Sequence, residues 1–116
     1  MVHLHIYASM NVADMAATAG EVSELMKVLS NKHRLMVLCQ LVDGEKSVGQ
    51  LAKLLGLREP AMSQQLAMLR REGLVRPRRE AQTIYYALAR DDVRQLMAFL
   101  YDTYCREPVS EGGGEP

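Results

Sequence analysis

Apolar residues recur at helical spacing along the first third of the chain. Residues 11–29 carry them every three or four positions, which predicts a first helix that Asn11 or Asp14 caps. Its apolar positions are Met15, Ala19, Val22, Leu25, Met26 and Leu29. Ser30 and Asn31 mark a break before a second predicted helix.

The second predicted helix covers residues 32–42 and ends at Asp43-Gly44. Its apolar residues are Leu35, Met36, Leu38, Cys39 and Val42. Because these positions surround most of the helix, we expect it to be buried.

The stretch 47–73, SVGQLAKLLGLREPAMSQQLAMLRREG, predicts two helices joined by a tight turn. Ser47 and Gln50 have the spacing of a capping box, and Gly56 is suited to end a helix. Glu59-Pro60 begins the second helix, since Pro is tolerated in a first helical turn, and Gly73 ends it. These helices have apolar sides at Val48, Leu51, Ala52 and Leu55, and at Met62, Leu66 and Leu69. The opposite side of the second helix carries Ala61, Gln64, Gln65, Met68 and Arg71.

The pattern changes after this pair of helices. Residues 74–79 and 83–88 are two short β-prone runs around the polar tip Glu80-Ala81-Gln82, which predicts a β-hairpin. Pro77 would place its strand at a sheet edge. Asp91 or Asp92 then begins a last helix that we expect to run to Cys105. Its apolar stripe is formed by Val93, Leu96, Met97, Leu100, Tyr101 and Tyr104.

Length and composition fit one mostly α-helical domain with a small hairpin. The chain has 116 residues, of which 48% are hydrophobic, so it can form a core, although dimerisation would help so small a domain. We expect residues 1–10 to be an extension and 106–116 a disordered tail, because the tail is rich in Gly, Pro and Glu.

Charge is unevenly distributed within a chain whose net charge is zero. Residues 58–90 hold seven Arg and three Glu, whereas residues 91–116 hold two Arg and six acidic residues. The hairpin carries Arg76, Arg78 and Arg79 directly after the second helix of the pair. A helical pair followed by a basic hairpin is typical of a winged helix-turn-helix, which favours DNA binding over an ordinary helical hairpin in a bundle.

The chain shows no run of about 20 apolar residues and no signal-peptide pattern, so we expect a cytoplasmic protein. Cysteines are normally reduced there, which argues against a constitutive disulfide between Cys39 and Cys105. Two free thiols remain a possible redox pair or two unrelated cysteines. His3 and His5 form a weak metal-binding pattern, and nothing in the sequence indicates an enzyme or a cofactor.

The sequence resembles the ArsR/SmtB family of dimeric winged-helix repressors over about residues 21–105. The resemblance rests on VLSNKHRLMVLCQL (28–41), the stretch 47–75 and IYYAL (84–88). It implies a winged domain over 11–105, with the helix-turn-helix at 47–72, the wing at 74–88, and a homodimer formed through helices 11–29 and 91–105. It also implies operator contacts from Ser63, Gln64 and Gln65; with the basic wing, the predicted DNA-binding residues are Ala61, Ser63, Gln64, Gln65, Arg71, Arg76, Arg78 and Arg79.

The metal sites known in this family are not matched here. The positions of a Cys-x-Cys pair are held by Ser47 and Gly49, which are poor ligands for soft metals. The other family site uses Asp, His and Glu on the last helix, where this chain offers only Asp91, Asp92 and Asp102. We therefore expect no bound metal.

One branch of the family senses persulfides and other reactive sulfur species, and it is similar to this chain at both cysteines. The resemblance implies that Cys39, within RLMVLCQLVDGEKSVG, and Cys105 are sensing thiols. It further implies that the reduced form represses and that a sulfur-bridged or disulfide form releases DNA. Alternatives are a repressor that answers general thiol oxidation or a thiophilic metalloid, and a helical interaction module that binds no DNA.

Overall fold

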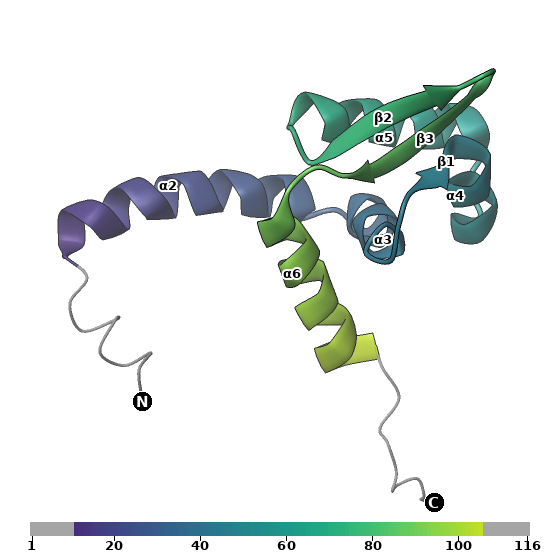
Figure 1. The fold of residues 1–116 in the computed structure, drawn as a ribbon. Helices are drawn as coiled ribbons and strands as arrows, with labels where there is room; N and C mark the ends of the chain where they lie inside the picture. Colours follow the sequence, from purple (N-terminus) through teal and green to yellow (C-terminus); the bar gives the residue numbers. More distant parts are fainter. Residues whose placement is uncertain (1–10, 106–116) are drawn as a thin grey trace, which may run out of the picture. The chain divides into compact units, whose positions relative to one another are not determined.

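The computed structural model describes residues 11–105, which form two parts, 11–31 and 32–105. The expectations for residues 1–10, including the His3 and His5 pattern, and for the tail 106–116 lie outside the described residues. Figure 1 gives the labels of the helices and strands.

The first part is a single helix, α2 (Val12–Leu29). The Asn11 side chain caps it by accepting a 2.8 Å hydrogen bond from the Asp14 backbone N–H. The predicted helix is confirmed to within one residue, and of the two candidate caps the structure selects Asn11. Several of its predicted apolar side chains are exposed, namely Met15, Val22 and Met26.

The second part contains four α-helices, one π-helical turn and three strands among residues 32–105. They are α3 (Lys32–Gln40), β1 (Lys46–Ser47), α4 (Val48–Leu55), α5 (Glu59–Arg71), β2 (Val75–Glu80), β3 (Thr83–Leu88), α6 (Asp91–Leu100) and η1 (Tyr101–Cys105). The β-hairpin extends beyond the helices α4 and α5, and α6 leads away from its base (Figure 1). This arrangement confirms the predicted winged helix-turn-helix.

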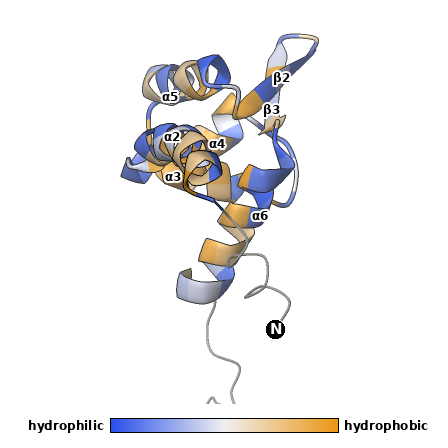
Figure 2. Ribbon diagram, turned by 90° about the vertical axis from the view of Figure 1, so that its left-hand side faces the viewer, coloured by the Kyte–Doolittle hydropathy of each residue, from blue (hydrophilic) through white to orange (hydrophobic). Residues whose placement is uncertain are grey.

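One apolar core holds the second part together. Its fully buried large side chains come from the four α-helices, from the turn after α3 and from the residue before β2, and they are Val37, Leu38, Leu41, Leu51, Met62, Leu66, Leu69, Leu74, Val93 and Met97. Orange and blue stretches alternate along α5 and α6, as expected of helices with one side in the core (Figure 2). Burying one such side chain contributes about 1.5–3 kcal/mol, so the core fixes how α4, α5 and the hairpin are presented.

The helix α3 differs from its prediction in length and in burial. It ends at Gln40, two residues before the predicted Val42, and Leu41 to Asp43 form a turn. Val37 is fully buried although it was absent from the predicted apolar set, while Met36 is exposed. The predicted burial of α3 is confirmed in part: Val37 and Leu38 are buried, Lys32 and Met36 are exposed, and the remaining residues of the helix are half-buried.

The two helices of the helix-turn-helix begin and end where the local signals predict. Ser47 and Gln50 form the complete capping box of α4, and Gly56 ends that helix in the left-handed conformation at φ 69°. Pro60 lies in the first turn of α5, and Gly73 follows that helix with φ +77°. Left-handed φ values cost least at glycine, which explains both glycines.

The sheet contains one strand that the sequence pattern did not indicate. The strands β2 and β3 pair antiparallel around the two-residue turn Ala81-Gln82, one residue shorter than the predicted tip. The short strand β1 adds to β3 and pairs Lys46 with Tyr86, giving the order β1-β3-β2. Pro77 therefore lies on an edge strand, as predicted.

The last helix is not continuous to Cys105. It begins with the acidic residues Asp91 and Asp92 in its first turn, as predicted, and is α-helical only to Leu100. Residues 101–105 continue as the π-helical turn η1, with no buried side chain. Such π-helical turns often occur at functional sites.

Candidate nucleic-acid interface and thiol site

The helix α5 separates an apolar side from a polar side. Met62, Leu66 and Leu69 are fully buried. The predicted DNA-binding residues Ala61, Ser63, Gln64 and Arg71 are exposed, and Gln65 is half-buried. Because the buried side anchors the helix, its polar side chains lie at the surface in a fixed register, as base readout in a major groove requires.

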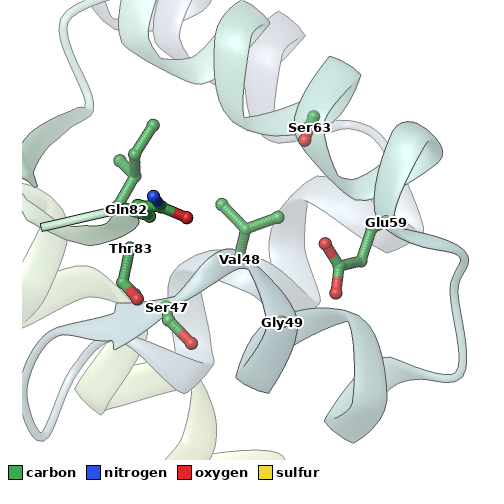
Figure 3. A pocket seen from close by; sticks show the side chains of 8 residues that line it. Ser47, Val48, Gly49, Glu59, Ser63, Gln82 and Thr83 are labelled. Atoms are coloured by element: carbon green, nitrogen blue, oxygen red, sulfur yellow. The ribbon is translucent and has the colours of Figure 1, made fainter.

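A pocket of about 400 Å³ lies between α5 and the turn of the hairpin. In Figure 3, Val48 lies between Gln82 of the turn and Ser63 of α5, while Glu59 points toward Gly49. A Cβ at Gly49 would lie 3.3 Å from Oε2 of Glu59, so little space exists there for a larger residue. Gln82 and Thr83 also line this pocket, and the sequence analysis missed them because only the fold brings the turn beside α5.

The three arginines of the hairpin have different surroundings. Arg76 donates from Nη1 to the Leu88 carbonyl at 3.2 Å. Arg79 is exposed, and no carboxylate among residues 11–105 pairs with it. Of these three arginines only Arg79 is thus fully available to an external phosphate, a difference that the charge pattern along the chain does not indicate.

Arg78 is held by two carboxylates and an aromatic ring. Its Nε and Nη2 donate to Glu45 at 3.1 and 2.6 Å, and its Nη1 donates to Glu80 at 2.9 Å. Its Cζ lies 4.8 Å from the centre of the Tyr85 ring. The hydrogen bond from Arg78 lowers the pKa of the Glu45 carboxyl, so Glu45 is ionised at neutral pH.

Cys39 lies in α3, and Cys105 lies in η1, the π-helical turn that continues α6. Cys39 is half-buried in the last turn of α3, with Sγ 3.8 Å from Sδ of the buried Met97. Cys105 is exposed at the end of η1, and both thiols are free. Burial raises the pKa of the Cys39 thiol, and the charge of Cys105 raises it further.

Beside Cys39 the protein leaves a pocket of about 350 Å³. Its lining comes from the end of α3 and the following turn, and from α6 and η1; the residues are Cys39, Gln40, Val42, Asp43, Ala98, Tyr101 and Asp102. Lys46 bonds Asp43 at 2.8 Å and lowers the pKa of that carboxyl. A half-buried thiol thus borders an open space large enough for a small reagent.

Within residues 11–105, no three His, Cys, Asp or Glu side chains gather where they could hold a metal ion. Ser47 caps α4 and Gly49 lies against Glu59. In the described part of the chain, no helix has the length and apolar character needed to cross a membrane.

The fold and the polar side of α5 define a winged helix-turn-helix regulator. Residues 31–76 match the family described as "Bacterial regulatory protein, arsR family". Transcriptional activator HlyU of Vibrio cholerae is 42% identical over 99 residues, which cover 85% of this chain and 92% of that protein. The biofilm growth-associated repressor of Xylella fastidiosa is 44% identical over 94 residues, covering 81% of this chain and 82% of the repressor. The chain belongs to the ArsR family.

Solved structures agree with this assignment. Reduced HlyU from Vibrio cholerae superposes with a TM-score of 0.78 at 41% identity, over 82% of this chain and all of that chain. The repressor BigR from Xylella fastidiosa gives 0.76 at 43% identity, over 84% of this chain and all of BigR. A homodimeric winged helix-turn-helix DNA-binding domain from Mycobacterium bovis gives 0.66 at 33% identity, over 82% of this chain and 88% of that domain. This protein is accordingly a DNA-binding transcriptional regulator.

Proposed function

We propose that this protein is a homodimeric repressor that releases operator DNA when reactive sulfur species join Cys39 to Cys105. The observation that carries the proposal is an open pocket lined both by the half-buried thiol of Cys39 and by residues of η1, the turn that ends at Cys105. Relatives named as regulators, one of them solved in a reduced form, support a redox-linked role.

The proposed DNA contacts divide between base readout and phosphate binding. Ser63, Gln64 and Gln65 on α5 would contact base edges, since Gln pairs bidentately with adenine and Ser bonds base or phosphate. The cations Arg71, Arg76, Arg78 and Arg79 would face the backbone, with Ala61 close to the bases. Phosphate contacts position the protein, and base contacts select the sequence.

The proposed dimer forms through the first and last helices. Large apolar side chains are exposed on both, including Met26 on α2, Phe99 on α6 and Tyr104 on η1. A pair of recognition helices must match half-sites one DNA turn, about 34 Å, apart. A bridge that pulls η1 toward α3 alters the dimerisation helix, and hence the spacing of the two recognition helices.

The proposed chemistry assigns different roles to the two thiols. Cys105 is exposed, so its thiolate attacks the outer sulfur of a persulfide R–S–SH; R–S⁻ leaves, and Cys105 becomes a persulfide. The Cys39 thiolate then attacks the inner sulfur of that group and releases hydrosulfide, which leaves a disulfide. The two thiols are oxidised, and the donor is reduced to a thiol and hydrogen sulfide.

A longer bridge forms when Cys39 has also become a persulfide. Its outer sulfur then attacks the inner sulfur of the Cys105 persulfide and expels hydrosulfide, so one added sulfur stays in the bridge. Two persulfide donors are consumed, giving two thiols and one hydrogen sulfide. The pocket beside Cys39 offers room for the added atom, and a longer bridge relaxes the limit of about 7 Å between Cα atoms that a disulfide imposes.

The test uses reduced protein and a duplex that this protein selects from a random-sequence library. We expect glutathione persulfide to weaken binding at least tenfold, and mass spectrometry to find a peptide that joins Cys39 to Cys105. A coupling of 1–3 kcal/mol corresponds to roughly 5–150-fold in affinity. Cys39→Ser should bind DNA normally and no longer respond, and a normal response of this variant refutes the proposal.

Parallel treatments separate the inducers, and a reporter separates repression from activation. Peroxide and As(III) are applied at the same concentration as the persulfide; a stronger response to either would assign general thiol oxidation or a metalloid as the signal. Because one relative is named an activator and another a repressor, a promoter carrying the selected duplex is fused to a reporter. We expect the reduced protein to lower its expression.

A further inference from the structure

The turn that follows Cys39 is anchored on two sides. Lys46 Nζ donates to the Gln40 carbonyl at 2.6 Å and to Asp43 Oδ1 at 2.8 Å. Arg94 of α6 donates from Nη1 to the Val42 carbonyl. These bonds hold the backbone between α3 and β1 in place. Glu45 lies at the end of this anchored segment, just before β1.

The carboxylate of Glu45 accepts hydrogen bonds from Nε and Nη2, the two donors on one edge of the Arg78 guanidinium. Two parallel bonds, Nε to Oε1 and Nη2 to Oε2, join the groups at 3.1 and 2.6 Å. Such a fork-to-fork pair has the geometry by which Arg also binds phosphate. A DNA phosphate and Glu45 therefore require the same donors of Arg78, and both cannot hold them at once.

The local charge reinforces this competition. Arg78 contributes one positive charge, whereas Glu45 and Glu80, both bonded to it, contribute two negative charges. The cluster, formed by two residues of β2 and by Glu45 beside it, has a net charge of −1 on the side of the molecule that is proposed to approach DNA. The Arg78 and Glu45 side chains are 50% and 39% exposed, so the pair is accessible and of the kind that solvent and ions weaken.

We propose that Glu45 is an autoinhibitory residue that competes with DNA phosphates for Arg78. The inference rests on the proposed function in one respect, namely that the hairpin approaches DNA. Binding of DNA exchanges the carboxylate of Glu45 for a phosphate, and the carboxylate returns when DNA leaves. The contact lowers the affinity for DNA of any sequence, because phosphate contacts carry no sequence information.

The test measures reduced protein on the selected duplex and on a duplex of shuffled sequence, over a series of KCl concentrations. Glu45→Gln should bind both duplexes about three- to tenfold more tightly, because the competitor is removed. The slope of log K against log salt should change by less than the roughly 0.9 that one whole phosphate contact contributes, because Arg78 meets a phosphate in both bound proteins. Glu72→Gln is the matched control, since it removes one exposed negative charge beside α5 that has no bond to Arg78.

A double-mutant cycle identifies the partner. Arg78→Gln should weaken binding little in the wild-type background, because the lost phosphate contact is offset by the lost contact with Glu45. In the Glu45→Gln background nothing offsets the loss, so the same substitution should weaken binding by at least threefold more. Equal effects of Glu45→Gln and Glu72→Gln, or equal effects of Arg78→Gln in both backgrounds, overturn the proposal. Thermal melting of each variant verifies that these surface changes leave the fold intact.

A second probe separates this inference from the thiol switch. Elution from heparin, a polyanion without base sequence, should require more salt for Glu45→Gln than for Glu72→Gln. This measurement uses no sulfur donor and no selected duplex. The heparin result for Glu45→Gln is therefore independent of what Cys39→Ser shows about sensing.

Discussion

The helix-turn-helix and the thiol site are built in opposite ways, although β1 begins only a few residues after Cys39. In the helix-turn-helix, Leu51, Met62 and Leu66 are fully buried, and α4 has a complete capping box. At the thiol site, Cys39 is half-buried beside an open pocket, and every residue of η1 is exposed.

This difference separates a rigid surface from a reactive one. Base readout needs side chains held in one register, which dense packing and capped helix ends supply. Thiol chemistry needs access for a reagent and freedom to change geometry, which regions with few buried contacts supply. The anchored turn 41–45 connects the two regions and carries Glu45 to the hairpin.

The largest effect should come from breaking the rigid region. Leu66→Ala removes a fully buried side chain beneath the proposed DNA-reading face, and we expect a loss of about 2–5 kcal/mol in the free energy of unfolding. Denaturation of the reduced protein over a series of urea concentrations, at one fixed protein concentration, measures this loss. The control is Leu54→Ala, at a side chain 55% exposed on α4, which should cost less than about 1 kcal/mol. Similar losses in both variants would contradict the rigid core described for α5.

A moderate effect should follow from removing one helix cap. Ser47→Ala deletes the side chain that accepts the Gln50 N–H at 3.1 Å, and we expect about 0.5–2 kcal/mol less stability. Ser63→Ala is the matched change on the exposed side of α5; it should leave stability nearly unchanged and weaken binding to the selected duplex. The same urea denaturation and binding titration test both variants. A Ser47→Ala protein with the same free energy of unfolding as the wild type would show that this capping hydrogen bond contributes nothing to stability.

The smallest effect concerns the reactivity of the two thiols. Burial and the charge of Cys105 raise the pKa of Cys39, so less of its reactive thiolate is present at neutral pH. We expect iodoacetamide to modify Cys39 at least about three times more slowly than Cys105 at pH 7. The rate at Cys39 should keep rising with pH above the range in which ordinary thiols titrate. Mass spectrometry of partly modified protein measures both rates.

Single-cysteine variants complete the test of reactivity. In Cys105→Ser the charge of the second thiol is gone, so the pKa of Cys39 should fall toward the value set by burial alone. The Cys39 rate should then rise slightly at a given pH. Faster modification of Cys39 than of Cys105 at pH 7 would reverse the proposed order of attack.

Local signals predicted the DNA-binding unit well. The capping box at Ser47, the glycines that end α4 and follow α5, and the edge position of Pro77 all act within a few residues along the chain. The polar side of α5 was predicted for the same reason, since Met62, Leu66 and Leu69 mark its buried side. The proposed operator contacts themselves stay predictions.

Helical spacing predicted less where tertiary contacts decide the outcome. The end of α3 at Gln40, the burial of Val37 and the π-turn after Leu100 depend on how the helices pack. The strand β1 has only two residues, too few for an alternating pattern, and it forms because β3 offers it an edge.

The sequence by itself determined the order of the helices, the helix-turn-helix, the wing and the identity of both cysteines, because these features follow from residues close together in the chain. Only the tertiary structure decided that Glu45 pairs with Arg78, which lies 33 positions later in the chain. It also decided that Cys39 borders a pocket beside η1. The physical reason is that hydrogen bonds, burial and pKa shifts depend on distances in space. The charge pattern along the chain therefore showed a basic hairpin, and only the fold revealed that Arg78 is already paired with two carboxylates.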